Sequence, residues 1–256
     1  MSAQQTETSN KASVKLIQPI TERFEISVHY SSWSLNPIKA TFEGELVDSI
    51  SRRIRSEIAN QARAVAPFLV RTDFDHSLGF DSSGSNYGVE IRFYPKGRGG
   101  SFSLGFTLEK TSMTMAIQGP IRQDFADGTY ADAEATGTLK LSPFSTHLNF
   151  RWDMVPKWIV SPYLVFGLGL APLSGDISYE FSGTYHWSGP SLTVEDYDAK
   201  SIKEAEELID FNIPSILVVF QLAIGVRADI ASHFVLLAEA GIWDGIMLRG
   251  GLGIRF

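Results

Sequence analysis

The C-terminal part of the sequence alternates apolar and polar side chains residue by residue, and the alternation runs to the last residue. In the final segment the even-numbered residues form the apolar parity, which ends on Ile254 and Phe256. The odd-numbered residues form the other parity, and most of them are small or charged, such as Arg249. The segments 215–227 and 234–242 repeat the pattern. A period of two residues is typical of a β-strand with two different faces. The chain is therefore constrained to a sheet that separates an apolar environment from a polar one.

Similar alternating segments lie upstream, which brings the number of predicted strands to eight. We expect these strands at residues 23–32, 87–94, 102–109, 144–153, 158–170, 215–227, 234–242 and 246–256. Two apolar runs, which begin at Trp158 and Phe211, are long enough to suggest membrane helices instead. Proline and glycine interrupt the first run, and β-branched residues fill the second, so both runs favour strands.

The connections between the predicted strands alternate between short and long, except for the last, which is a tight turn at 243–245. Short connections lie near 96–100, 155–157 and 229–232, and long ones near 37–84, 118–133 and 183–212. In outer-membrane barrels short turns face the periplasm and long loops face outside. The sequence thus predicts an all-β fold, an eight-stranded antiparallel transmembrane up-and-down β-barrel with helical insertions in its external loops. The predicted location is the bacterial outer membrane, with both termini on the periplasmic side.

Aromatic residues provide a second indication of which face meets lipid. Seven of them lie on the apolar parity at the predicted periplasmic strand ends: Phe24, Phe93, Phe102, Trp152, Trp158, Phe234 and Phe256. Alternation alone would also fit a soluble barrel or sandwich with an apolar interior. A ring of aromatic residues at one level is typical of the membrane interface. These residues therefore predict an aromatic girdle and a lipid-facing outer wall.

Composition excludes several classes of function. The net charge of -7 argues against nucleic acid as a partner, and the absence of cysteine excludes disulfides, thiolate metal sites and a cysteine nucleophile. The opening MSAQQTETSN has neither a basic nor an apolar signal-peptide region. We therefore expect a mature exported chain, with residues 1–21 as a flexible periplasmic leader and residues 22–256 as the barrel.

Two segments change the period from two residues to about four. Leu46, Ile50, Ile54, Ile58 and Ala62 repeat at four-residue spacing within residues 42–66, which predicts an amphipathic helix in the first external loop. Residues 200–209 predict a second, shorter helix in the third loop. The apolar stripes need a surface to cover. We expect a packed cap over the barrel mouth, with a role at the membrane surface or in partner binding as the alternative.

Charged residues on the polar parity predict the content of the barrel interior, which in an eight-stranded barrel is just wide enough to be filled by side chains. Pairing the last two strands across their turn places Glu239 opposite Arg249 and predicts a salt bridge, with His29 on the neighbouring closing strand. The predicted network also includes Glu90, Glu109, Arg151, Asp153, Gln221 and Arg227. Such a network either holds the barrel together or lines a narrow conduit for protons or small solutes.

One pair of residues suggests enzymatic chemistry. His29 and Ser31 lie two apart on a strand and resemble the His-x-Ser motif of the outer-membrane lipid A deacylases. Their parity turns them inward, and their place in the first strand departs from that family. We therefore predict no catalytic residue and no enzymatic activity. The other histidines lack metal-ligand spacing, so neither a metal nor a cofactor is predicted.

Several motifs resemble the small eight-stranded outer-membrane proteins, in particular the outer membrane protein W and A barrel families. They are SPYLVFGLGL, GVRADIASHFVLLAEAG and the terminal GIRF. The resemblance implies contact with outer-membrane lipid and insertion by the barrel-assembly machinery through the strand that ends at Phe256. For the W-like family it implies a narrow channel or a binding site for small hydrophobic molecules. The alternatives are a non-conducting structural or adhesive barrel and a membrane-embedded lipid hydrolase.

Overall fold

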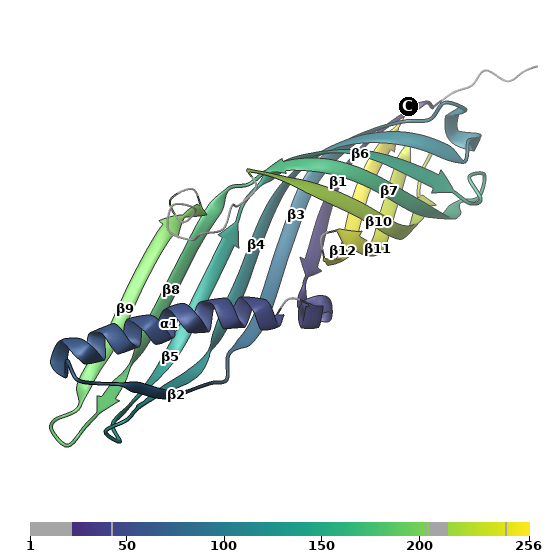
Figure 1. The fold of residues 1–256 in the computed structure, drawn as a ribbon. Helices are drawn as coiled ribbons and strands as arrows, with labels where there is room; N and C mark the ends of the chain where they lie inside the picture. The colour runs from purple at the N-terminus through teal and green to yellow at the C-terminus, as the bar shows by residue number, and fades with distance from the viewer. Residues whose placement is uncertain (1–21, 42, 203, 205–214, 244) are drawn as a thin grey trace, which may run out of the picture.

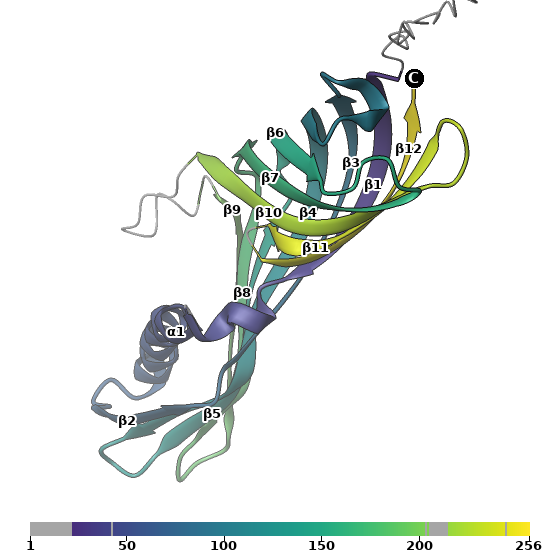
Figure 2. The same ribbon diagram turned by 90° about the vertical axis from the view of Figure 1, so that its right-hand side faces the viewer.

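A computed structural model describes residues 22–41, 43–202, 204, 215–243 and 245–256. Eight antiparallel strands hydrogen-bond in a closed ring (Figure 1; Figure 2). In ring order they are β1 (Phe24–Ser34), β3 (Gly79–Phe93), β4 (Phe102–Phe125), β6 (Phe144–Asp153), β7 (Val160–Pro172), β10 (Ile216–Asp229), β11 (Phe234–Trp243) and β12 (Ile246–Arg255). Because β12 pairs with β1, no edge of the barrel sheet is open. The predicted eight-stranded antiparallel barrel is confirmed.

The outer wall of the ring is apolar along its whole circumference. On β12, for example, Leu248, Leu252 and Ile254 point outward and are about half exposed. A strand of 10 residues such as β12, tilted by about 40°, rises about 25 Å, which matches the apolar band of an outer-membrane barrel. The barrel part of the strands thus has the length and the outer polarity that a bilayer requires.

Four further strands continue the sheet beyond one end of the barrel, at the lower left of Figure 1, in segments between the predicted strands. They are β2 (Arg71–His76), β5 (Tyr130–Leu141), β8 (Gly175–His186) and β9 (Leu192–Ser201). With the far ends of β3 and β4 they form the extension sheet, in which β4 pairs with β2, β3 and β5, β5 pairs with β8, and β8 pairs with β9 (Figure 1). The expected loops at 37–84, 118–133 and 183–212 are therefore wrong in these parts. These strands carry apolar side chains on the inward face and polar ones on the outward face, which is the reverse of the pattern in the barrel strands.

Strand β4 shows how one strand serves both parts. Its 24 residues exceed what a membrane strand needs. Below Lys110 the outward side chains are apolar, such as Phe106, and the inward ones are polar, such as Glu109. Beyond Lys110 the faces exchange, so that Ile117, Ile121 and Phe125 point inward and are buried, while polar side chains point outward. The exchange marks where the wall leaves the lipid.

Helix α1 (Glu43–Val65) covers the apolar inward face of the extension sheet (Figure 1). Its buried stripe of Ile54, Ile58 and Ala62 packs against Ile121, Phe125 and the alanines of β5, and Phe181 and Tyr185 of β8 complete this core. The side chains of Leu46 and Ile50, which belong to the same predicted stripe, lie outside the described ones. In the described part of the chain, no helix has the length and apolar character needed to span a membrane.

Short 3-10 turns accompany these elements at Asn36–Thr41 (η1) and Gly97–Gly99 (η2). The second predicted helix, 200–209, is wrong at its start, because Lys200 and Ser201 belong to β9. Ile202 and Glu204 are helical, and the carboxylate of Glu204 accepts hydrogen bonds from the N–H and hydroxyl of Ser201 at 2.9 and 2.8 Å. The rest of this predicted helix and the predicted leader lie outside the described residues.

Candidate functional site

The barrel interior is filled by charged and polar side chains in successive layers, starting at the end where Phe256 lies. Glu25 on β1 is at the centre of the first layer and is fully buried. Its carboxylate accepts hydrogen bonds from Nη2 of Arg255 and from the hydroxyl of Tyr94, both at 2.7 Å. The guanidinium of Arg151 lies 3.4 Å from the other carboxylate oxygen and also donates to Tyr94. One carboxylate thus holds two arginines from opposite sides of the ring.

Two further acids continue this layer toward β7 and β10. Asp153 lies 3.2 Å from Nη1 of Arg227 and 3.7 Å from Nε of Arg151. Asp229 lies 3.2 Å from Nε of Arg227 and 3.8 Å from Nη1 of Arg255. Arginine and acid therefore alternate across the floor of the barrel, and every guanidinium in the layer has at least two acidic neighbours. This pairing offsets the cost of removing the charges from water.

The middle layer is built around Arg92 of β3. Its guanidinium donates to Glu90 at 2.8 Å, to the hydroxyl of Ser103 at 3.1 Å and to the side-chain oxygen of Asn149. Asn149 in turn donates to Glu90 at 2.8 Å. Gly105 makes the arrangement fit, since a Cβ there would lie 2.4 Å from Oδ1 of Asn149. The layer spans β3, β4 and β6 and leaves the polar groups hydrogen-bonded to one another.

The third layer joins both sides of the ring through Glu109 of β4. Oε1 of Glu109 lies 2.6 Å from Nη2 of Arg249 and 2.6 Å from Nε2 of His29, and Oε2 lies 3.7 Å from Nε2 of His147. Arg249 also lies 3.5 Å from Glu239, its register partner on β11. The layer therefore connects β1, β4, β6, β11 and β12 through one carboxylate and one guanidinium.

An apolar layer closes the interior at the end toward the extension sheet. Trp33, Trp243 and Met247 are buried there, and the guanidinium of Arg249 lies over the Trp243 ring at 4.8 Å. The indole N–H of Trp33 donates to Asn86 at 2.9 Å. Leu35 links this cluster to Val47 of α1 and to Phe80 and Ile117. A continuous apolar strip thus runs from the barrel mouth to the underside of α1.

The structure places all nine residues of the predicted network inside the barrel, but in separate layers. Arg249, Glu239, Glu109 and His29 meet in the third layer, although the direct partner of Arg249 on β1 is Ser31 and not His29. The members in the other layers are Glu90, Arg151, Asp153 and Arg227. Gln221 is buried on β10 and pairs with Gly167 of β7. A Cβ added to Gly167 would lie 3.0 Å from Oε1 of Gln221.

Sequence reasoning missed Glu25, Tyr94, Asn149 and Tyr163 as members. Glu25 contacts Arg151, Arg255 and the hydroxyl of Tyr94, and it points to the same side of β1 as His29, so the same rule could have found it. Tyr163 donates to Glu239 at 3.0 Å, which depends on contacts across the barrel that no local pattern encodes. The inward parity of Asn149 and Tyr94 was visible, but their partners were not.

The aromatic residues of the predicted girdle lie on the outer wall at the end where the terminal strands meet. The Phe24 ring lies 5.3 Å from that of Phe93 and 6.1 Å from that of Phe256, and Phe24 and Phe256 also exchange backbone hydrogen bonds of 2.9 Å. Trp158 lies in the turn before β7 and is 67% exposed. The remaining outward members are Phe102, Trp152 and Phe234.

The structure contradicts the placement of His29 and Ser31 on the outer wall, which the lipid-hydrolase alternative requires. His29 and Ser31 both point into the barrel and are buried, at 8% and 0% exposure. The His29 ring contacts Glu109, and the Ser31 hydroxyl accepts a hydrogen bond from Nε of Arg249 at 2.8 Å. A lipid ester outside the wall cannot reach either side chain. Among the described residues, no cluster of three or more histidine, aspartate or glutamate side chains could hold a metal ion.

An apolar outer wall around a charged and filled interior is the arrangement of a transmembrane β-barrel of the bacterial outer membrane. The charges inside pair with one another over 2.6 to 3.8 Å. Because some of the pairs join strands that are not neighbours in the ring, such as Glu25 with Arg151 and Glu109 with Arg249, the network fastens the ring across its interior. Chemically it can hold the wall in shape and resist the passage of ions.

Neither a protein-family model nor a curated protein matches the sequence. Among solved structures, the β domain of the Bordetella autotransporter BrkA has a TM-score of 0.30 at 11% identity, over 92% of this chain and 100% of that chain. The translocator domain of the autotransporter NalP from Neisseria meningitidis has a TM-score of 0.30 at 11% identity, over 94% and 91%. The transport unit of AIDA-I from Escherichia coli has a TM-score of 0.20 at 8% identity, over 98% and 93%. At these scores the fold assignment rests on the strand pairing of the chain itself.

Proposed function

We propose that the chain is a non-conducting outer-membrane barrel that holds the extension sheet and α1 outside the cell as a platform for binding. The observation that carries the proposal is the interior network, in which Arg151, Arg227 and Arg255 are at most 2% exposed and contact acids from other strands. An open conduit would leave such groups hydrated. The side that holds the platform follows from the short turns at the opposite end, which face the periplasm in this class.

Conductance in a planar bilayer tests the closed interior. We expect no current steps from the wild-type chain, because three polar layers and an apolar layer fill the interior. A variant in which alanine replaces one large side chain of every layer, Arg151, Arg92, Arg249 and Trp243, should give steps. Folded chain migrates differently from boiled chain on SDS gels, and both samples must show this shift, so that the absence of current reports a closed barrel and not an unfolded one. Steps of stable size from the wild type would contradict the proposal.

The apolar layer favours a second candidate function, the holding of a small hydrophobic molecule at the barrel mouth. Trp33 and Trp243 lie in that layer together with Met247 and Val219. This role corresponds to the one that resemblance to the W-like family implies. A brominated long-chain alkyl ligand should then quench the tryptophan fluorescence of the chain, and Met247→Ala, which removes a large side chain from the layer, should change that quenching. Fluorescence that stays constant up to the solubility limit of the ligand would remove this candidate.

A further inference from the structure

The outward face of the extension sheet carries many more acidic than basic side chains. The carboxylates on this face, by strand register, are Asp75, Asp81, Asp124, Asp132, Glu134, Asp176, Glu180 and Glu195. Arg122 and Lys140 are the permanently cationic side chains on the same described strands and face, and His186 lies there 3.8 Å from Asp132. With histidine neutral, these eight carboxylates and two cations sum to six net negative charges. A surface of one sign attracts a partner of the other.

This face has no covering element in the described part of the chain, because α1 packs on the opposite side of the sheet. Arg122 is already engaged, with Nε 3.0 Å from Asp124, Nη1 3.5 Å from Asp132 and its guanidinium 3.9 Å from the centre of the Tyr130 ring. Among the described residues, Glu134, Glu180 and Glu195 form no ion pair. The charge of the face is thus largely uncompensated within the molecule.

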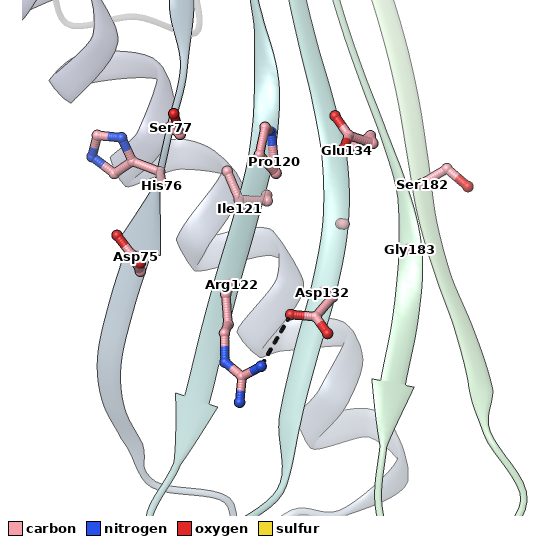
Figure 3. A pocket seen from close by; sticks show the side chains of 11 residues that line it. Asp75, His76, Ser77, Pro120, Ile121, Arg122, Asp132, Glu134, Ser182 and Gly183 are labelled. Carbon is pink, nitrogen blue, oxygen red and sulfur yellow. Dashed lines mark ion pairs between the residues drawn. The ribbon is translucent and has the colours of Figure 1, made fainter.

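A hollow of about 430 Å³ opens in the middle of the face (Figure 3). Small groups line it, including Ser182 and Gly183 of β8 and Pro120 of β4. The acidic side chains of Asp132 and Glu134 of β5 and Asp75 of β2 also line it, together with Arg122 of β4. A volume of this size can take a long side chain.

From these features we propose that the outward face of the extension sheet docks a basic segment of another polypeptide, with a lysine or arginine side chain in the hollow. The inference rests on the proposed role of the extension as a binding platform. The carboxylates are spread over β2, β3, β4, β5, β8 and β9, so they suit an extended chain with several positive charges better than a single small cation. Anionic lipid headgroups carry the same sign as the face and would be repelled.

Peptide binding to the full chain in phosphatidylcholine nanodiscs tests the proposal, with calorimetry at low salt as the measurement. The probes are two twelve-residue peptides, one that alternates lysine with serine and one that alternates glutamate with serine. We expect the lysine peptide to bind and the glutamate peptide not to bind, and we expect added salt to weaken the binding because exposed charges are screened. Equal binding of both peptides, or binding of neither, would overturn the proposal.

Paired variants locate the site. The double variant E134Q/E180Q should weaken binding of the lysine peptide about three- to tenfold, since exposed charge pairs contribute modestly, whereas D48N/E57Q removes the same charge from α1 and should change it less than twofold. Ser182→Trp fills the hollow without changing charge and should weaken binding, while Ser178→Trp lies on the same strand and face but outside the hollow. Equal effects within either pair would overturn the site.

Peptide binding in nanodiscs and current in a planar bilayer together separate this inference from the proposed function. If peptide binding is absent and the chain gives no current in a planar bilayer, the docking inference fails alone. If the chain conducts and still binds the lysine peptide at the E134Q/E180Q-sensitive face, the closed-barrel proposal fails and the docking surface stands.

Discussion

The charge network makes a sharp prediction at Glu25, because this one carboxylate faces two guanidiniums. The substitution Glu25→Gln keeps the size of the side chain and removes only its charge. Arg255, at 2.7 Å, and Arg151, at 3.4 Å, then lose their shared partner in a fully buried setting. Breaking a buried pair by removing one member costs about 3–5 kcal/mol. Asp229 and Asp153 remain within 3.8 Å of the two arginines, so we expect the lower end, about 3 kcal/mol.

The measurement is the free energy of unfolding in urea, with the chain folded into lipid vesicles and the folded fraction read from gel mobility. Glu134→Gln is the matched control, since it makes the same chemical change on the exposed extension sheet and should shift stability by less than about 0.5 kcal/mol. The double variant Glu25→Gln with Arg255→Met removes one of the two stranded cations and should recover part of the loss. If the free energy of unfolding of Glu25→Gln equals that of the control, the ion pairs of the first layer do not stabilise the barrel and the reasoning is refuted.

Three further predictions address other parts of the chain. Ile58→Ala, at a fully buried position in the core between α1 and the sheet, should weaken the docking of the helix by about 2–5 kcal/mol. Limited proteolysis should then cut α1 faster while the gel shift of the barrel persists, and a cleavage rate equal to that of the wild type would contradict this prediction. Gly169→Ala should lower refolding yield because its Cβ would lie 2.0 Å from Nδ1 of His147, whereas Gly250→Ala meets nothing within 4 Å and should be neutral; equal yields would count against the packing argument. Hydrogen bonds from the side chain and backbone of Ser201 lower the pKa of Glu204. The carboxylate therefore stabilises this turn at pH values above its ordinary pKa, and the stabilisation is lost as the pH falls through the lowered pKa. Ser201→Ala should raise the pKa of Glu204 in an NMR titration, and an unchanged titration would refute the assignment.

The barrel could be predicted from the sequence because its strands obey one local rule. Every ring strand places apolar side chains on one parity, as in Phe24, Ile26 and Val28 of β1, and lipid imposes that rule equally on all of them. The pairing of Glu239 with Arg249 also follows locally, since both residues lie on one hairpin with a short turn. The contact of Glu109 with Arg249 and His29 does not, because it crosses the barrel between residues 80 or more positions apart.

The extension sheet escaped prediction because its polarity is the reverse of that in the barrel. A search for strands with one consistent apolar parity stops on β4 at Lys110, where the faces exchange. β5 shows the reversed rule, with Ala131, Ala133 and Ala135 buried and Asp132 and Glu134 outward. Small alanines carry a weak hydrophobic signal, so the strand resembles a loop by composition. The exchange itself is visible in the sequence, and it predicts both the membrane boundary and a second apolar surface that needs a cover.

That second surface explains why the chain has α1 between β1 and β2. Inside the barrel each wall faces another wall, so polar side chains find partners across the ring, as Arg249 finds Glu109. Above the membrane the extension sheet has no opposite wall, and an inward face as polar as that of the barrel could not hold it together. Its inward side chains are therefore apolar, and α1 supplies the missing wall with Ile54, Ile58 and Ala62. The alanines of β5 let the helix approach closely. Because α1 packs on the inward side, the outward face of the sheet is the broad surface available to a partner.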